Sequence, residues 1–333
     1  MSESTIPASG PSDTILDIGG LLVGQAEDQK ALTGVSVVIA KAGAVAGADL
    51  RGGGSGTREL NLLDPMTATD LVHAVVLSGG SAFGLDAAGG VMAWLEERGI
   101  GFDTGSAIVP LVPQAILYDL WLGDSKVRPD QAMAKRACDN ATADGHGLLQ
   151  GNYGAGCGAS VGKIRMGVGA MKSGIGSASV QLANGFTVGA LVAVNALGDV
   201  YEDGRIIAGM LGPDGQGFGD SSRVMLRMAS CAINAGRNTT IGIIATNGKF
   251  SKPQCCRIAA MGHNGMARAV RPLHTTMDGD ILFALATGEL AASLDVAGEM
   301  AAMAVERAIV KAVKAAAPAG GLPSWQSLNR SNC

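Results

Sequence analysis

The sequence predicts an α/β fold in which helical layers cover mixed β-sheets. Segments with strand spacing and helix spacing alternate irregularly along the chain, and residues 177–181 and 186–195 have the pattern of two strands. Ala183-Asn184-Gly185 joins these strands in a sequence typical of a β-hairpin. Because a regular doubly wound parallel sheet is built from crossover connections instead of hairpins, the pattern favours mixed sheets.

The composition is that of a globular chain whose core consists mainly of small side chains. Hydrophobic residues make up 47% of the 333 residues, aromatic residues 4% and charged residues 16%, which is the opposite of a disordered chain. The 50 glycines, about 15% of the chain, have no Gly-X-Y period, so they exclude collagen. We expect a poorly ordered, flexible lead-in over residues 1–30 and a single domain over residues 31–333.

The first half of the chain alternates short strands, loops and helices. Strands are predicted where short apolar runs are bounded by glycine or proline, and helices where apolar residues recur with helical spacing. The expected elements are a strand at 35–40, a flexible glycine loop at 51–56, a strand at 71–78, a helix ending near Arg98, a strand or irregular segment at 108–120, and a helix at 128–149.

The second half begins with dense glycines and ends with a long amphipathic helix. Ser251 is suited to cap a helix, and Pro253 fits its first turn. The expected elements are the hairpin, a turn at 202–205, a flexible loop at 211–222, a strand at 240–247, a helix at 251–270, a strand at 281–287, a helix at 294–314 and a loose tail from Pro318.

Charge and hydropathy exclude several classes of partner. The net charge is −4, and no stretch concentrates lysine and arginine, so we expect no nucleic-acid partner. No apolar run reaches about 18 residues without a charge or a turn signal, so no membrane-spanning helix is expected. Residues 1–17 lack the basic start and apolar core of a secretory signal, which favours a cytoplasmic protein.

Cysteine and histidine spacing predicts neither a disulfide framework nor a metal site. The cysteines form no C-x-x-C pair, and the four histidines are scattered, so no zinc pattern arises. We therefore expect reduced cysteines and no metal or other cofactor. The cysteines stand at positions 138, 157, 231, 255, 256 and 333.

Two short motifs approach known functional patterns but depart from them. Residues 79–83 (GGSAF) follow a strand and precede a helix, as in a nucleophile elbow, but Phe83 stands where that pattern needs glycine. His274 would complete a triad there; the alternative is a tight turn whose helix N-terminus holds an anion. Residues 158–164 resemble a phosphate-binding loop with a misplaced first glycine, and Ile164 replaces the required serine or threonine.

Thr239 is the more informative candidate nucleophile, because it follows a loop-like segment and precedes an apolar strand. A threonine hydroxyl needs a base, and an N-terminal threonine can use its own α-amine, whose ordinary pKa is about 7.7–8.0. That amine exists only if the bond between Asn238 and Thr239 is cut, so this interpretation requires a chain that cleaves itself. The alternative is that Asn238-Thr239-Thr240 caps or begins an exposed strand.

Six segments of the chain form a joint signature that is more specific than any one of them. They are GGSAFGLD (79–86), VPLVPQAILYD (109–119), GAGCGASVGK (154–163), VGALVAVN (188–195), NTTIGIIATN (238–247) and HTTMDGD (274–280). In this order they resemble the L-aminopeptidase/D-Ala-esterase/amidase family, which includes β-aminopeptidases and the 6-aminohexanoate-oligomer endohydrolase. The resemblance covers roughly residues 30–315.

The resemblance implies a four-layer αββα sandwich of mixed sheets flanked by helices, as in N-terminal-nucleophile hydrolases, so that residues 31–333 form one catalytic domain. It also implies self-cleavage into an α chain, 1–238, and a β chain, 239–333, and homo-oligomers of this αβ unit. Thr239 would become the N-terminal nucleophile and form an acyl-enzyme, which water activated by the freed α-amine would hydrolyse.

The same resemblance implies roles for five further residues. Asn195 would donate its side-chain N–H to the oxyanion of the tetrahedral intermediate, and the Tyr118 hydroxyl would orient the nucleophile. Lys163 would hold the nucleophile's amine neutral by like-charge repulsion. Asp278 and Asp280 would orient Lys163 or the amine, or receive a substrate ammonium. The structural alternatives are a turn at a strand end for Asn195, a core aromatic for Tyr118, a surface lysine for Lys163, and an ordinary turn for Asp278 and Asp280.

The expected activity is aminopeptidase-type cleavage of a small peptide, an amino-acid amide or an oligoamide. The aminopeptidase branches commonly combine serine with a Ser/Glu pair, so Thr239 with Asp278 and Asp280 is more similar to the nylon-oligomer hydrolase. An endo-amidase acting on aminohexanoate oligomers is therefore one alternative. The others are an acyltransferase similar to ornithine acetyltransferase and an uncleaved, non-catalytic binding protein.

Overall fold

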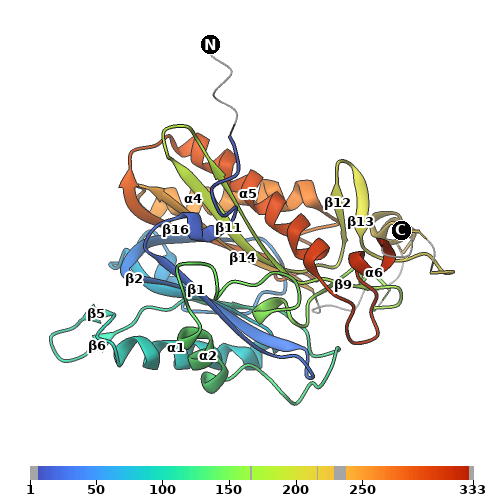
Figure 1. Cartoon of the computed structure of the whole chain (residues 1–333), viewed down its shortest axis with the longest axis horizontal. Coiled ribbons are helices and arrows are strands. Elements are labelled where there is room, and N and C mark those ends of the chain that lie inside the picture. Colours follow the sequence, from blue (N-terminus) through green and yellow to red (C-terminus); the bar gives the residue numbers. More distant parts are fainter. Residues whose placement is uncertain (1–6, 166, 216, 229–237, 330–333) are drawn as a thin grey trace, which may run out of the picture.

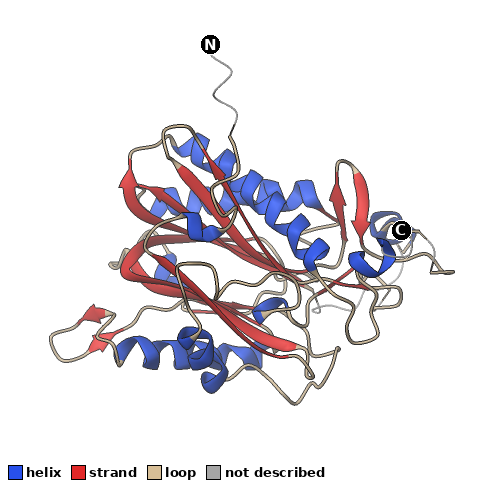
Figure 2. Ribbon diagram, in the orientation of Figure 1, coloured by secondary structure: helices blue, strands red, loops and turns tan. Residues whose placement is uncertain are grey.

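The chain folds into four layers, which Figures 1 and 2 show from the side as helices, sheet, sheet and helices. The computed structural model describes residues 7–165, 167–215, 217–228 and 238–329. One outer layer consists of α4 (Lys252–Ala269) and α5 (Leu294–Ala315), and the other of α1 (Ala87–Glu96) and α2 (Gln131–Asp139). The αββα arrangement implied by the family resemblance is thereby confirmed.

The two inner layers belong to one continuous hydrogen-bonded sheet with the strand order β10-β11-β14-β16-β2-β4-β7-β3, and β1 pairs with β2. The long strand β2 passes from one layer to the other, because it pairs first with β1 and β4 and then with β16. Its strands are β1 (Leu21–Asp28), β2 (Thr33–Leu50), β3 (Thr57–Arg58), β4 (Leu71–Ser78), β7 (Gln114–Ile116), β10 (Ile175–Gln181), β11 (Thr187–Asn195), β14 (Thr239–Gly248) and β16 (Ile281–Leu290).

Shorter elements complete the described chain. The small strand pairs are antiparallel, and β8 with β9 lies next to the end of β11. These elements are β5 (Phe102–Asp103), β6 (Ile108–Val109), β8 (Ser160–Val161), β9 (Met171–Lys172), β12 (Asp199–Glu202), β13 (Arg205–Ala208), β15 (Val270–Arg271), α3 (Ser221–Arg227), α6 (Trp325–Asn329), and the 3-10 turns η2 (Ile15–Asp17), η3 (Leu60–Leu63), η4 (Ser81–Asp86) and η5 (Gly154–Gly156).

Three apolar cores separate the four layers. On β11, Leu191 and Ala193 belong to the core between the sheets, whereas Val192 and Val194 belong to the core under α4 and α5. A third core packs α1 and α2 against β1, β2 and β4. Because successive side chains of a strand point to opposite faces, a strand covered on both faces must be apolar throughout. This explains why the central strands show uninterrupted apolar runs.

Most predicted elements are confirmed, and the helix predicted over residues 128–149 is the clearest difference. The helix spans only 131–139, begins where the Asp130 side chain accepts from the Met133 N–H at 2.7 Å, and is followed by a turn. Beyond it, Gly145 has a φ of +92°, and Thr142 exchanges backbone hydrogen bonds with Val23 of β1. Pairing with the sheet edge and a left-handed glycine therefore replace the continued helix.

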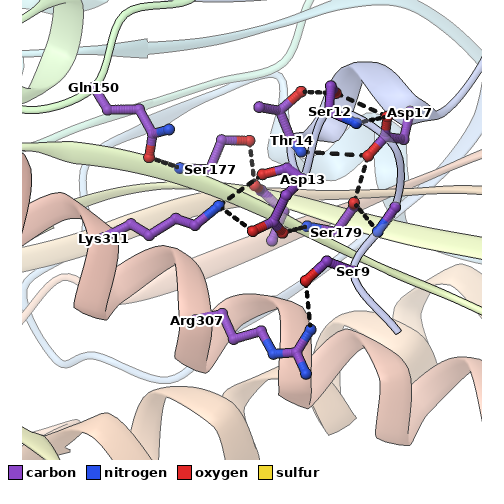
Figure 3. A network of polar contacts seen from close by, with 12 residues as sticks. Ser9, Ser12, Asp13, Thr14, Asp17, Gln150, Ser177, Ser179, Arg307 and Lys311 are labelled. Atoms are coloured by element: carbon purple, nitrogen blue, oxygen red, sulfur yellow. Dashed lines mark hydrogen bonds and ion pairs between the residues drawn. The ribbon is translucent and has the colours of Figure 1, made fainter. Parts of the chain in front are cut away.

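The lead-in predicted over residues 1–30 is wrong for its described part, because residues 21–28 form β1 and residues 15–17 form η2. Figure 3 shows how the polar segment before β1 is held: Asp13 forms an ion pair with Lys311 of α5 at 2.6 Å, and Ser179 Oγ donates to Asp17 at 2.5 Å. Its serines and aspartates make contacts within the fold, so their polarity does not indicate disorder.

Candidate active site

Asn195 and Thr239 lie opposite each other at the adjoining ends of two central strands. Asn195 is the last residue of β11, Thr239 is the first of β14, and the antiparallel register pairs them directly. Such partners have Cα atoms about 4.5–5.5 Å apart. The side chains are buried, with exposed fractions of 0% for Asn195 and 3% for Thr239. The sheet thus brings the predicted nucleophile and the predicted oxyanion donor together.

The peptide bond between Asn238 and Thr239 has its carbonyl oxygen between two donors. The Gly279 N–H donates to the Asn238 carbonyl oxygen at 2.9 Å, and Thr239 Oγ1 contacts the same oxygen. A Cβ at position 279 would lie 2.9 Å from Thr239 Oγ1 and 2.8 Å from the Gly54 carbonyl oxygen. Glycine is therefore required between the two aspartates.

The amide group of Asn195 is held at both of its ends. Oδ1 accepts from Lys163 Nζ at 2.7 Å and from the Ser160 N–H at 3.1 Å, while Nδ2 donates to the Tyr118 carbonyl at 2.9 Å. Donors on one side and an acceptor on the other fix which end of the amide is oxygen. Tyr118 uses one of the two Nδ2 hydrogens, and an amide nitrogen carries a second.

Tyr118 reaches this group through its backbone carbonyl, and the role of its hydroxyl stays a prediction. The next residue, Asp119, is fully buried and was not among the predicted site residues. Its carboxylate accepts from the Gly80 N–H and the Thr33 hydroxyl, both at 2.7 Å, and burial raises the pKa of Asp119. The signal that could have found it is its place at the end of the VPLVPQAILYD segment.

Lys163 is a buried residue, so the alternative of a surface lysine is wrong. Its exposed fraction is 6%, and Nζ also donates to the Asn195 backbone carbonyl at 2.8 Å. Burial lowers the pKa of Lys163 to about 7, against the attraction of Asp278, Asp119 and Asp280. A lysine in this state can be charged or neutral near neutral pH.

Asp278 and Asp280 are buried on either side of Gly279. Asp280 Oδ1 accepts from the Thr240 N–H at 2.7 Å, which ties this segment to the start of β14. Asp278 accepts from the backbone N–H and the hydroxyl of Thr275, at 3.0 and 2.5 Å. Burial and the nearby charge of Asp280 raise the pKa of Asp278 to about 6.

His274 also belongs to this group, and it is not among the site residues predicted from the sequence. Its Nδ1 lies 2.9 Å from Asp280 Oδ2 and its backbone N–H donates to the same oxygen. Because a carboxylate only accepts, Nδ1 carries the proton in this contact. His274 thus supports an aspartate of the site, and this contact is not that of a triad with the GGSAF segment.

The glycine loop predicted to be flexible is packed against the aspartate segment. The Gly54 N–H donates to the Asp278 carbonyl at 2.8 Å, and the Arg51 N–H donates to the Asp280 carbonyl at 3.0 Å. A Cβ at Gly52 would lie 2.3 Å from the Asp278 carbonyl oxygen, so the close approach requires glycine. The loop forms a wall of the site.

The described residues hold no cluster of three or more histidine, cysteine or acidic side chains that could bind a metal ion. Cys138, Cys157, Cys255 and Cys256 are free thiols, and positions 231 and 333 lie outside the described residues. Within the same described part of the chain, no helix is both long and apolar enough to cross a membrane.

The assembled groups are those of acyl transfer: a hydroxyl beside a carbonyl, amide donors, a lysine of lowered pKa and an acidic pair. All six predicted site residues lie in one connected region, since Tyr118, Asn195 and Lys163 share hydrogen bonds, and Asp278 and Asp280 flank the start of β14.

Comparison with known proteins finds a matching family and similar sequences. The chain matches the model of Peptidase family S58 over residues 13–324. It is 39% identical to an uncharacterized aminopeptidase of Mycobacterium tuberculosis, with 95% of this chain and 98% of that protein covered. It is 32% identical to the 6-aminohexanoate-oligomer endohydrolase of Kocuria sp., with 86% and 78% covered.

Solved structures show the same fold. The β-aminopeptidase of Burkholderia sp. superposes with a TM-score of 0.72 at 23% identity, covering 98% of this chain and 95% of that one. The L-aminopeptidase D-Ala-esterase/amidase of Ochrobactrum anthropi, described as a variant of the N-terminal-nucleophile hydrolase fold, gives 0.70 at 22% identity, with 98% and 94% covered.

Proposed function

Because this chain belongs to peptidase family S58 and has the fold of N-terminal-nucleophile hydrolases, we propose that it cuts itself between Asn238 and Thr239 and then hydrolyses amide bonds with the new N-terminal threonine. One observation carries this proposal. Thr239 Oγ1 contacts the carbonyl of the peptide bond that precedes it, and the Gly279 N–H donates to the same oxygen.

Self-cleavage begins when Thr239 Oγ attacks the carbonyl carbon of Asn238. The Gly279 N–H stabilises the negative oxygen that forms, as an oxyanion-hole donor does. The C–N bond then breaks, the Thr239 nitrogen takes the hydroxyl proton, and Asn238 is left as an ester on Thr239. Water hydrolyses the ester, which releases the Asn238 carboxylate and leaves Thr239 with a free hydroxyl and a free α-amine.

Substrate cleavage uses the same hydroxyl, with the α-amine as base. The hydroxyl proton passes through the amine to the leaving nitrogen of the substrate, the acyl group stays on Thr239, and water activated by the amine then releases it. The second Nδ2 hydrogen of Asn195 is the donor for the oxyanion in this reaction. Lys163, through its two bonds to Asn195, fixes that donor next to Thr239.

Small peptides and amino-acid amides are the proposed substrates, in line with the aminopeptidase relatives. Endo-cleavage of aminohexanoate oligomers is the second candidate, which the threonine nucleophile and the paired aspartates favour alongside 32% identity to such an enzyme. A panel of L-aminoacyl, D-alanyl, β-peptidyl and aminohexanoyl anilides separates the candidates. A homo-oligomer of αβ units and a cytoplasmic location are further parts of the proposal.

Denaturing mass spectrometry tests the mechanism directly. We expect wild-type protein to give two fragments that meet at 238/239, and Thr239→Ala to stay intact and inactive. Thr240→Val is the matched control, because the buried Thr240 hydroxyl has no hydrogen-bond partner and valine has the same shape. An intact wild-type chain after prolonged incubation, or a fully active Thr239→Ala chain, contradicts the proposal.

A further inference from the structure

A second buried lysine, Lys172, has no part in the mechanism above. Its exposed fraction is 0%, and it lies on β9 opposite Ser160 of β8. Nζ donates to the carbonyl oxygens of Ser173, Ala159 and Gly156, at 2.5, 2.9 and 3.3 Å. An ammonium has three N–H donors, so the charged lysine satisfies all three carbonyls, whereas a neutral amine has only two donors.

One of these carbonyls belongs to the peptide unit that holds Asn195. The Ala159 C=O accepts from Lys172, and the Ser160 N–H of the same unit donates to Asn195 Oδ1 at 3.1 Å. A trans peptide unit is planar, so its C=O and N–H point in opposite directions, and fixing one end fixes the other. A hydrogen bond from an ammonium is roughly twice as strong as a neutral one.

The other end of the Asn195 amide is held next to a buried carboxyl group. Nδ2 donates to the Tyr118 carbonyl, and the following residue is Asp119. The Asp119 carboxylate is fixed by the Gly80 N–H and the Thr33 hydroxyl, which locks this stretch of chain against the β4 end and β2.

Asp119, Lys163 and Lys172 also interact electrostatically. The carboxylate attracts both Lys163 and Lys172 and so opposes the loss of their protons. Burial lowers the pKa of Lys172 to about 7. The neighbouring Cys157 thiol is neutral at this pH, because burial raises its pKa to about 12.

We propose that Lys172 and Asp119 are positioning residues for amide cleavage, which orient the oxyanion donor of Asn195 through the Ala159–Ser160 peptide unit on one side and the Tyr118 carbonyl on the other. This inference rests on the proposed function, in which Asn195 is the oxyanion donor. Both residues act through Asn195, so their loss lowers kcat more than it changes KM.

The first test replaces Lys172 by methionine, which keeps the length of the side chain and removes the ammonium. We expect kcat per processed active site to fall about 10–100-fold, as for a modest misplacement of a catalytic group, with KM changed less than about threefold. Lys252→Met is the matched control. Lys252 is also buried with Nζ bonded to backbone carbonyls, those of Leu62, Asp64 and Thr67, but it follows the far end of β14.

Both lysine variants should lose thermal stability, but only Lys172→Met should lose kcat. Equal kcat values for Lys172→Met and wild type, measured per processed site, overturn the inference. A wild-type chain that neither cuts itself nor cleaves any anilide contradicts the proposed function instead, so the two failures are distinguishable.

A second variant keeps the inference testable if Lys172→Met does not fold. Asp119→Asn preserves size and the acceptor for the Gly80 N–H but replaces the ionisable carboxyl group by a neutral amide. We expect a lower kcat. We also expect the alkaline limb of the pH profile of kcat to move to lower pH, because Lys163 and Lys172 then lose their protons more readily. The other titratable groups that face these two lysines are Asp278, Asp280 and the neutral Cys157. An unchanged kcat and an unmoved limb overturn the inference.

Discussion

Asn195 is bound so that its oxygen end is fully used and its nitrogen end is oriented by a single acceptor. Lysine and backbone donors face Oδ1, and the Tyr118 carbonyl faces Nδ2. The only group that fits this surrounding is an amide, since a carboxylate would place an oxygen against the Tyr118 carbonyl. The contacts of Oδ1 and Nδ2 therefore require an asparagine at this position, as does the proposed role of Nδ2 as oxyanion donor.

Because of these contacts, Asn195→Asp tests the proposed donor role with almost no change in side-chain volume. It exchanges the Nδ2 donor for an acceptor, so the oxyanion loses its donor and the Tyr118 carbonyl loses its partner. We expect kcat to fall about 100–1000-fold, which is the usual effect of losing one oxyanion-hole donor. Steady-state kinetics on an anilide substrate measure it, and a variant with more than about a tenth of wild-type kcat contradicts the role.

Gly279 is predicted to control self-cleavage. In Gly279→Ala the new methyl group would press on Thr239 Oγ1 and on the Gly54 carbonyl. The peptide N–H that donates to the Asn238 carbonyl would shift, and we expect cleavage to slow by at least about tenfold. The time course of fragment formation on a denaturing gel measures this rate.

Gly89→Ala in α1 serves as the control for that variant, because its Cβ would meet only the flexible side chain of Gln131. Alanine in a helix interior is more stable than glycine by about 0.5–1 kcal/mol, so this control should cut normally and melt slightly higher. If Gly279→Ala cuts as fast as Gly89→Ala, the Gly279 N–H is not the donor for self-cleavage.

The raised pKa of Asp278 predicts a pH-dependent cost to stability. Folding raises the pKa from 3.8 to about 6, so the unfolded chain ionises Asp278 more readily and stability falls between these two values as pH rises. In the uncut Thr239→Ala background, Asp278→Asn should remove this cost, which is about 3 kcal/mol at most. Its melting-temperature gain should be absent near pH 4 and full above about pH 6; a gain that does not depend on pH contradicts this.

The residues proposed to take part in the chemistry could be predicted from the sequence more readily than the residues proposed to position them. Thr239, Asn195 and Lys163 stand in motifs whose order resembles a known family, and the sheet register then places Asn195 against Thr239. Asp119 and Lys172 stand within or near the same motifs, but their importance comes from complete burial and from which carbonyls they meet. Spacing along the chain does not encode either property.

At the scale of elements, a glycine loop that looks flexible in the sequence packs against the candidate site. Glycine permits both flexibility and close packing, and a sequence does not show which of the two is used. Residues 51–56 are packed closely, because four backbone hydrogen bonds join residues 51–54 to Thr275, Asp278 and Asp280. A polar segment is ambiguous in a similar way, because its side chains can face solvent or form hydrogen bonds within the fold. In the segment before β1, serines and aspartates form hydrogen bonds to the edge strand β10 and to α5.

Gly52→Ala is expected to separate the glycine loop from the aspartate segment. Its Cβ would lie 2.3 Å from both the Asp278 carbonyl oxygen and the Asp280 nitrogen, so backbone must move. We expect self-cleavage and turnover both to fall by about tenfold or more while the fold persists. Circular dichroism and cleavage kinetics measured together check this, and normal kinetics would show that the loop is not a functional wall.

At the scale of the whole molecule, the proposed cut lies in the middle of the sheet, where strands of the α chain and strands of the β chain pair with each other. The β chain supplies β14 and β16, which sit side by side between β11 and β2 of the α chain. Each is hydrogen-bonded to an α-chain neighbour, β14 to β11 and β16 to β2. Helices α4 and α5 of the β chain also cover this layer, so the cut leaves the layers interlocked.

We therefore expect the two fragments to remain one particle after cleavage and to unfold in one transition. Separation should require denaturant, because it would expose the edges of β11 and β2 and the core between the sheets. Gel filtration in buffer and in urea measures this, and refolding of each fragment alone and of the mixture extends it. The uncut Thr239→Ala chain provides the reference for unfolding. An α chain that keeps native circular dichroism and protease resistance without its β chain would contradict the interlocked sheet, since its central strands would then be dispensable.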